Sequence, residues 1–206
     1  FRRVLFRSNR LEQRMTLPQR IFFSGAPGSR WSGVAQLIES CPGFNVTDRT
    51  PERTFHFPPY SDHLGAYFGT GMEFDLSLNP ENIDSAHTDL LGCRLIKAHE
   101  WALKLPEIKQ HYPDSWICLV YRSDLLCYSW WNGAGGFNIS YPTYHQFGNQ
   151  IDMMHTISRI NNAMLEFSYQ HNAVWSHLTP SWVQANFGVE REVNHKFQDM
   201  LITIVK

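Results

Sequence analysis

Apolar positions along the chain form two kinds of pattern, short continuous runs and runs at helical spacing. Continuous apolar runs, typical of buried strands, occur at residues 20–24, 93–97, 116–121 and 200–205. Helical spacing or capping signals predict helices over residues 34–38, 101–111, 123–131 and 152–170, and from Pro180 after the capping residue Thr179. Strands alternating with helices predict a three-layer α/β/α domain around a central, mostly parallel sheet.

The N-terminal segment differs from the sequence that follows it. Residues 1–14 are basic and carry no turn or capping signal, and residues 3–8 match the translation of a common sequencing-library adapter. We therefore interpret residues 1–14 as a non-native or disordered extension. Residues 15–206 are expected to form a single domain, which a chain of 206 residues can build around one core.

Residues 47–80 have no sustained period and are rich in Pro, Gly, Asp, His and aromatic side chains. Long irregular segments are usually functional lids or disordered, and the aromatic residues from Phe55 to Phe74 favour an ordered one. Together with Trp130, Trp131, Gly133 and Gly135, this stretch is either a pocket for an acceptor molecule or a set of packing and turn elements.

Composition excludes several function classes. The net charge of −1 disfavours broad nucleic-acid or anionic-membrane binding, and no apolar run approaches the roughly 18 residues that span a bilayer. The four cysteines form no CxxC pair and no metal-ligand spacing, which indicates a reducing, cytoplasmic environment without zinc. The N-terminus lacks the apolar core of a signal peptide.

A glycine-rich turn follows the first apolar run: Gly25-Ala26-Pro27-Gly28-Ser29-Arg30-Trp31-Ser32-Gly33. Between a strand and a helix, such a turn directs several backbone N–H groups to one place, where the helix dipole adds positive potential. It predicts a P-loop-like phosphate-binding turn; the alternative is an ordinary tight turn. Compared with the pattern G-x-x-x-x-G-K-[ST], Gly25 and Ser32 fit, whereas Arg30 and Trp31 replace the second Gly and the Lys.

Two further strands end in candidate functional residues. Lys97 and His99 follow the strand at 93–97, at the edge where open α/β sheets bind ligands. Arg122 follows the strand at 116–121, and Ser129 comes seven residues later. A metal-dependent nucleotide hydrolase would carry an Asp where Arg122 stands, so this position favours a phosphate held by a guanidinium without a metal.

These three segments together resemble the sulfotransferase family in order, element type and spacing. The family's P-K-S-G-T-T-W loop is similar to residues 27–32, its K-[TS]-H segment to residues 97–99, and its V-R-[ND]-P strand end with a following Ser to residues 120–122 and Ser129. The resemblance covers roughly residues 19–131. Two features of the family are missing. The position of its loop Lys is Gly28 here, and its C-terminal R-K-G-x-x-G-D-W-K signature, which closes over the nucleotide, is absent, so that Arg191 or Lys196 would have to take the place of this signature.

The resemblance implies a transferase that moves a sulfuryl group from PAPS (3′-phosphoadenosine 5′-phosphosulfate) to a hydroxyl or amine of a small-molecule or glycan acceptor, without a metal. It implies that His99 is the general base and that Lys97 and Arg30 stabilise developing negative charge. The donor would be held by Pro27, Gly28, Ser29, Arg30, Trp31, Ser32, Arg122 and Ser129. A P-loop kinase of a small metabolite and a non-catalytic nucleotide-binding protein on the same fold remain alternatives.

Overall fold

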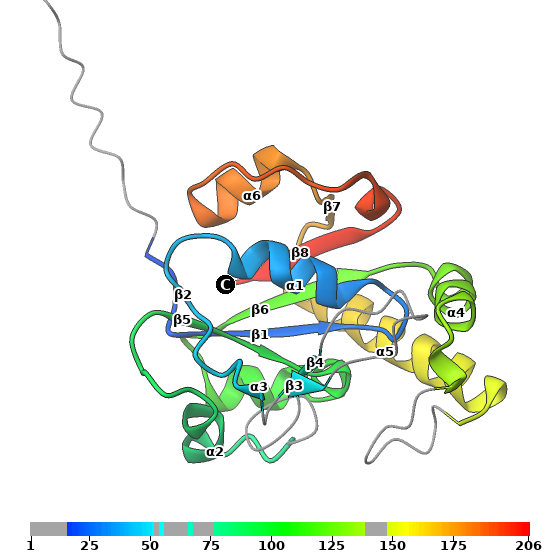
Figure 1. Cartoon of the computed structure of the whole chain (residues 1–206), viewed down its shortest axis with the longest axis horizontal. Coiled ribbons are helices and arrows are strands. Elements are labelled where there is room, and N and C mark those ends of the chain that lie inside the picture. The colour runs from blue at the N-terminus through cyan, green and yellow to red at the C-terminus, as the bar shows by residue number, and fades with distance from the viewer. Residues whose placement is uncertain (1–15, 52–53, 56–65, 68–75, 139–147) are drawn as a thin grey trace, which may run out of the picture.

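A computed structural model describes residues 16–51, 54–55, 66–67, 76–138 and 148–206 of the chain (Figure 1). Its main feature is a six-stranded sheet in the order β2-β5-β1-β6-β8-β7. The strands are β1 (Arg20–Gly25), β2 (Phe44–Asn45), β5 (Cys93–Lys97), β6 (Trp116–Tyr121), β7 (Ser176–His177) and β8 (Leu201–Val205). A separate pair, β3 (Thr54–Phe55) and β4 (Ala66–Tyr67), lies outside this sheet.

The sheet is mostly parallel, as the continuous apolar strands predict. Strands β2, β5, β1 and β6 run parallel, whereas β8 pairs antiparallel with β6, and β7 antiparallel with β8. Every residue of β5 and all but the first residue of β1 are buried. Such strands need cover on both faces, which explains their lack of polar alternation.

Helices cover both faces of the sheet (Figure 1). The helices are α1 (Trp31–Glu39), α2 (Pro80–Ser85), α3 (Leu105–His111), α4 (Asp124–Gly133), α5 (Gln150–Gln170) and α6 (Pro180–Phe187), with the 3₁₀ turns η2 (His99–Leu103), η3 (Gly136–Asn138) and η5 (His195–Phe197). Helices α1 and α6 pack on one face and α2, α3, α4 and α5 share the core of the other. The predicted α/β architecture is therefore confirmed. No described helix has the length and apolar character required to cross a membrane.

The capping prediction at Thr179 is confirmed, because its side chain accepts a hydrogen bond from the N–H of Trp182 at 3.1 Å and α6 begins at Pro180. The single helix expected over 101–111 is wrong in detail. It is divided into η2 and α3 at Lys104, whose φ of −124° is not helical. Pro106 has no N–H with which to continue one helical ladder through this point.

The order of the strands places a topological switch beside β1. The chain leaves β1 through α1 toward the outer strand β2, whereas it later passes from β5 to β6, on the other side of β1. In open α/β sheets, ligands bind outside the carboxyl ends of the strands at such a switch. The segments that follow β1, β5 and β6 therefore form the candidate site.

Candidate functional site

The turn after β1 is a tight β-turn of four residues, Ala26 to Ser29. The N–H of Ser29 donates to the carbonyl of Ala26 at 3.0 Å, and Gly28 has a φ of +80°. Proline at the second position and a left-handed glycine at the third are the signature of a type II turn. The structure thus shows a tight turn between β1 and α1, built by Pro27 and Gly28; its phosphate-binding, P-loop-like character stays a prediction.

Gly28 also lies against helix α4. A Cβ on Gly28 would stand 2.0 Å from the backbone carbonyl oxygen of Cys127. No side chain fits there unless α4 moves. At this position the sulfotransferase loop carries its lysine, so the departure seen in the sequence has a packing reason in this chain.

Helix α1 begins directly after the turn without a side-chain cap. Its capping residue Arg30 is left-handed, with φ 60° and ψ 19°, a conformation that favours glycine. This is the position at which the G-x-x-x-x-G-K-[ST] pattern has its second glycine, and the backbone there keeps the conformation of a glycine. Within the described residues, the amide groups of Trp31 and Ser32 have no backbone acceptor, as expected for a helix start.

The hydroxyl of Ser29 is the most unusual polar group of the turn. It is fully buried and has no hydrogen-bond partner among the described residues. It lies inside the turn, 2.8 Å from the place that a Cβ on Gly25 would take. Buried hydroxyls are normally hydrogen-bonded, so this one keeps a hydrogen-bonding capacity that the described residues do not use.

His99 is fixed against the turn. Its Nδ1 lies 2.5 Å from the carbonyl oxygen of Gly25, and its ring lies 4.2 Å from the ring of Trp31, centroid to centroid. Because a carbonyl only accepts, Nδ1 must carry the proton, and in the neutral ring Nε2 is then the basic nitrogen. The backbone carbonyl of His99 is held in turn by the hydroxyl of Ser24 at 2.9 Å.

Lys97 is buried at the end of β5, where it is the register partner of Phe23 on β1. Two residues further on, His99 contacts the turn after β1, which brings the segments at 25–32 and 97–99 together.

Arg122 connects the third segment to the turn, through acceptors that belong to the protein. Its Nη1 donates to the carbonyl of Gly28 at 3.1 Å, while Nε and Nη2 both donate to Oδ2 of Asp199, at 3.0 and 2.5 Å. Nη1 also donates to the carbonyl of Leu126 at 3.1 Å. The guanidinium of Arg122 thus stabilises the turn through the Gly28 carbonyl, while the carboxylate of Asp199 from the C-terminal segment neutralises the guanidinium charge.

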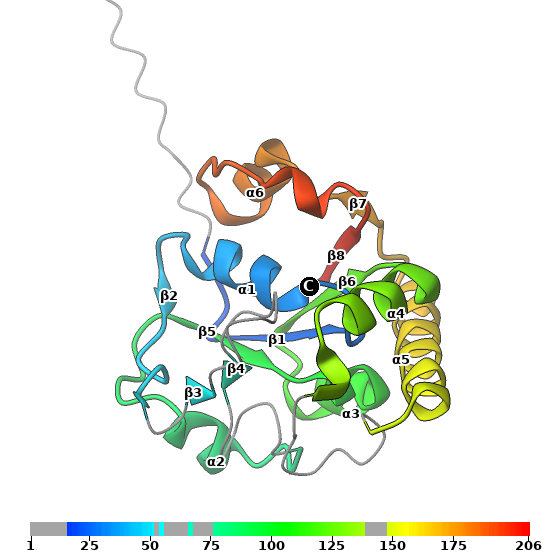
Figure 2. The same cartoon turned by 45° about the vertical axis from the view of Figure 1, so that its right-hand side comes forward.

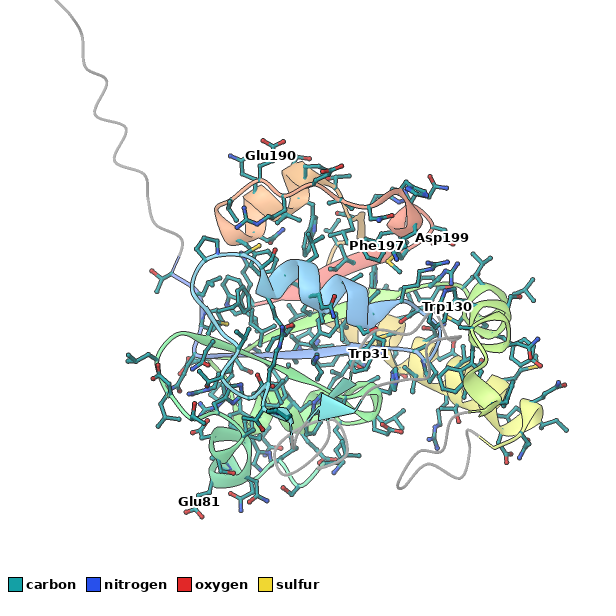
Figure 3. All side chains as sticks on the ribbon, viewed as in Figure 1. Trp31, Glu81, Trp130, Glu190, Phe197 and Asp199 are labelled. Atoms are coloured by element: carbon teal, nitrogen blue, oxygen red, sulfur yellow. The ribbon has the colours of Figure 1, made fainter. Side chains whose placement is uncertain are left out.

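The remaining predicted binding residues have different surroundings. Ser129 is exposed on α4, and no hydrogen bond between described residues joins it to Arg122. The guanidinium of Arg30 lies over the ring of Trp130 on α4, 5.5 Å from its centroid. Trp130 and Asp199 lie toward the same end of the molecule, whereas Glu190 and Glu81 lie elsewhere on its surface (Figure 3).

The proposed acceptor residues divide into two groups. Trp131 is buried in the core beneath α4, and a Cβ on Gly136 would overlap its indole, so Trp131 packs. Trp130 is half-buried beside Arg30. Most of the aromatic segment from Phe55 to Phe74 lies outside the described residues.

The two residues suggested as substitutes for the missing C-terminal signature, Arg191 and Lys196, lie in different places relative to the turn after β1. Arg191 donates to the carbonyl of Ser40 at 2.9 Å, at the end of α1 that is remote from the turn. Lys196 is exposed on η5, three residues before Asp199, and is therefore close in the chain to the carboxylate that holds Arg122.

All four cysteines are free and buried. Burial raises the pKa of Cys93 and of Cys127 to about 12, and it raises the pKa of Cys118 further. Thiols held in the neutral form are poor nucleophiles and poor metal ligands. In the described part of the chain, no three His, Cys, Asp or Glu side chains group together in a way that could hold a metal ion.

Sequence reasoning missed Ser24, Asp199 and Asn161. Asn161 donates to the carbonyl of Arg122 at 2.8 Å and to Asp124 at 2.7 Å, and so fixes the turn between β6 and α4 to α5. Asn161 and Asp199 lie 39 and 77 residues from Arg122 in the chain. No local pattern marks either residue, because each acts only through a long-range contact.

The chain has no significant match among protein-family models, curated proteins or solved structures. Function must therefore be argued from the residues and their geometry.

Proposed function

We propose that this protein transfers a sulfuryl group from PAPS to a hydroxyl or amine of an acceptor, with the start of α1 as its anion site and His99 as its base. The observation that carries the proposal is the hydrogen bond of His99 Nδ1 to Gly25, which orients the imidazole at the turn and leaves Nε2 as its basic nitrogen.

The start of α1 supplies what an anion requires. The amides of Trp31 and Ser32 precede any intrahelical partner, the helix dipole favours negative charge, and the buried Ser29 hydroxyl lacks a partner among the described residues. Nε2 of His99 would take the proton of the acceptor as the acceptor oxygen or nitrogen bonds to sulfur. The sulfur–oxygen bond to the donor's phosphate breaks in the same step, and 3′,5′-bisphosphate nucleotide (PAP) leaves with the electron pair.

The fit to PAPS is incomplete at two positions. No loop lysine assists the leaving group, because Cys127 occupies the space beside Gly28. Arg122 can meet the 3′-phosphate of the donor only if that phosphate takes the place of the Asp199 carboxylate. Lys97 and Arg30 are the remaining candidates for the charge-stabilising role.

A second function, nucleotide binding without catalysis, is favoured by Gly28 alone. If the transfer step requires a loop lysine, a chain that cannot place one there would bind the nucleotide and release it unchanged. Both functions require the anion site, and only the first requires His99.

The decisive experiment is calorimetry with PAP, ADP and ATP, in EDTA and in Mg²⁺. We expect PAP to bind in EDTA at least about tenfold more tightly than ADP, since a charge-assisted hydrogen bond is worth about 1.5–3 kcal/mol. Mg²⁺-dependent ATP binding without any gain from the 3′-phosphate would instead identify a kinase. Binding of none of the three nucleotides would remove both functions proposed here.

Ser29→Ala makes the test specific to the turn. It removes a hydroxyl that has no partner among the described residues, so the free energy of unfolding should stay the same or rise by about 1 kcal/mol, while PAP affinity should fall about tenfold. The matched control is Ser40→Ala, at the opposite end of α1, whose exposed hydroxyl donates to Leu37. Equal PAP affinity for both variants would show that Ser29 is not a ligand.

A further inference from the structure

The outward face of α5 carries large apolar side chains that the fold does not cover. Ile151 and Tyr169 are 68% and 85% exposed, and Met154 and Leu165 are 53% and 37% exposed. Val174, just beyond the helix, is 77% exposed. These five residues make up half of the large apolar residues exposed in the described ranges, and they lie toward the two ends of one helix. Exposed apolar side chains gathered on one face, instead of scattered singly over the surface, favour an interaction site.

The four helical residues share one face of α5. They follow one another at intervals of three, eleven and four residues, each close to a whole number of helical turns. The buried side of the same helix, which includes Met153, Ile157, Ile160 and Met164, packs into the core. Figure 2 shows α5 along the outer edge of the molecule, with α4 and the sheet on its inner side.

The middle of this face is a shallow groove with small side chains and opposite charges. The groove measures about 610 Å³ and is lined by residues of α5 between His155 and Glu166 and by Leu103. Its lining includes the short side chains of Ser158, Asn162 and Ala163, which permit close approach by another helix. Arg159 and Glu166 line the same groove and are both exposed.

If two copies of α5 pack about a two-fold axis, the charge of Arg159 in one copy faces the opposite charge of Glu166 in the other. Arg159 precedes Asn162 by three residues and Glu166 follows it by four, which places them ~4.5 Å and ~6 Å from Asn162 along the helix. In two antiparallel α5 helices with the axis at Asn162, each Arg159 therefore lies level with the Glu166 of the other copy. Ile151 at one end then meets the end that carries Tyr169 and Val174.

We infer that two copies of this chain associate through α5, in an antiparallel pair centred on Asn162. Such an isologous contact covers the apolar ends of both helices and forms the Arg159–Glu166 pair twice. The inference does not depend on the proposed function, because none of these residues belongs to the site at the start of α1.

The test is sedimentation velocity of the full chain and its variants across low to high micromolar concentrations. The unaltered chain should show a concentration-dependent dimer. Arg159→Glu and Glu166→Arg should each weaken the dimer at least about tenfold, because each places two like-charged pairs across the axis. The double variant Arg159→Glu/Glu166→Arg restores both pairs with reversed polarity and should return the dissociation constant to within about threefold.

Glu190→Arg is the matched control, since Glu190 is exposed outside α5 (Figure 3). It should leave the dimer unchanged. A chain that stays monomeric at every concentration would overturn the inference. A dimer that tolerates both single reversals, or one that the double variant fails to restore, would overturn it equally, since its contact would lie elsewhere.

Discussion

Gly28→Ala tests whether the turn after β1 and helix α4 are locked together. Gly28 combines a left-handed backbone, at φ +80°, with a Cβ position 2.0 Å from the carbonyl oxygen of Cys127. The left-handed conformation costs a residue with a Cβ about 1–2 kcal/mol. Displacing well-packed neighbours costs about 1–3 kcal/mol more, so the free energy of unfolding should fall by about 2–5 kcal/mol.

Two other glycines separate these contributions. Gly188 has a φ of +73° and nothing within 4 Å of its Cβ position, so Gly188→Ala should show only the backbone cost. Gly133 has the same open space without a positive φ, so Gly133→Ala should be neutral or stabilising by up to about 1 kcal/mol.

Equilibrium unfolding in urea at neutral pH measures all three variants under one condition. The difference between Gly28→Ala and Gly188→Ala isolates the contact with α4. If Gly28→Ala lowers the free energy of unfolding no more than Gly188→Ala does, the turn is not locked to α4 and the packing reason for the missing lysine is refuted.

Three further predictions concern catalysis, a buried charge and pH. His99→Ala should lower the turnover of an acceptor found by screening about 10²- to 10⁴-fold, while the affinity for PAP changes by no more than a few-fold. A loss of PAP affinity with an unchanged turnover rate would show that His99 is a structural residue. Arg94→Met should lower the free energy of unfolding by about 1–3 kcal/mol in chemical denaturation, because it removes the fully buried partner of an ion pair with Asp84 (3.3 Å) and the donor to the Leu90 carbonyl, while Arg20 still holds Asp84 and limits the loss; a gain of stability would contradict this. Burial raises the pKa of all four thiols above the ordinary 9.0, so above that pH the unfolded chain binds fewer protons than the native one. The free energy of unfolding should then fall as pH rises through that window, by about 1.4 kcal/mol per unit for each thiol, and Cys118→Ala should make this slope shallower; an unchanged slope would show that Cys118 does not contribute.

The sequence alone was sufficient to predict four of the six strands of the central sheet, β1, β5, β6 and β8. Strands β5 and β6 have the bounds that the apolar runs indicate, because a strand buried on both faces must be continuously apolar. The start of helix α6 could also be predicted from local sequence, since the Thr179 side chain caps the helix that begins at Pro180. Two-residue strands such as β2 and β7 are too short to leave a pattern, and only pairing with their neighbours defines them.

The sequence also determined which chemical groups stand at the ends of three strands: a glycine turn, a Lys and His pair, and an Arg. Only the tertiary structure decided what those groups contact. Arg122 is bound to Asp199 from the far end of the chain, Gly28 faces a carbonyl of α4, and Ser29 is buried without a partner among the described residues. The physical reason is that strand and helix patterns follow from neighbours along the chain. The charge and the free hydrogen-bonding capacity of a site instead depend on contacts between distant segments, and no spacing in the sequence records those contacts.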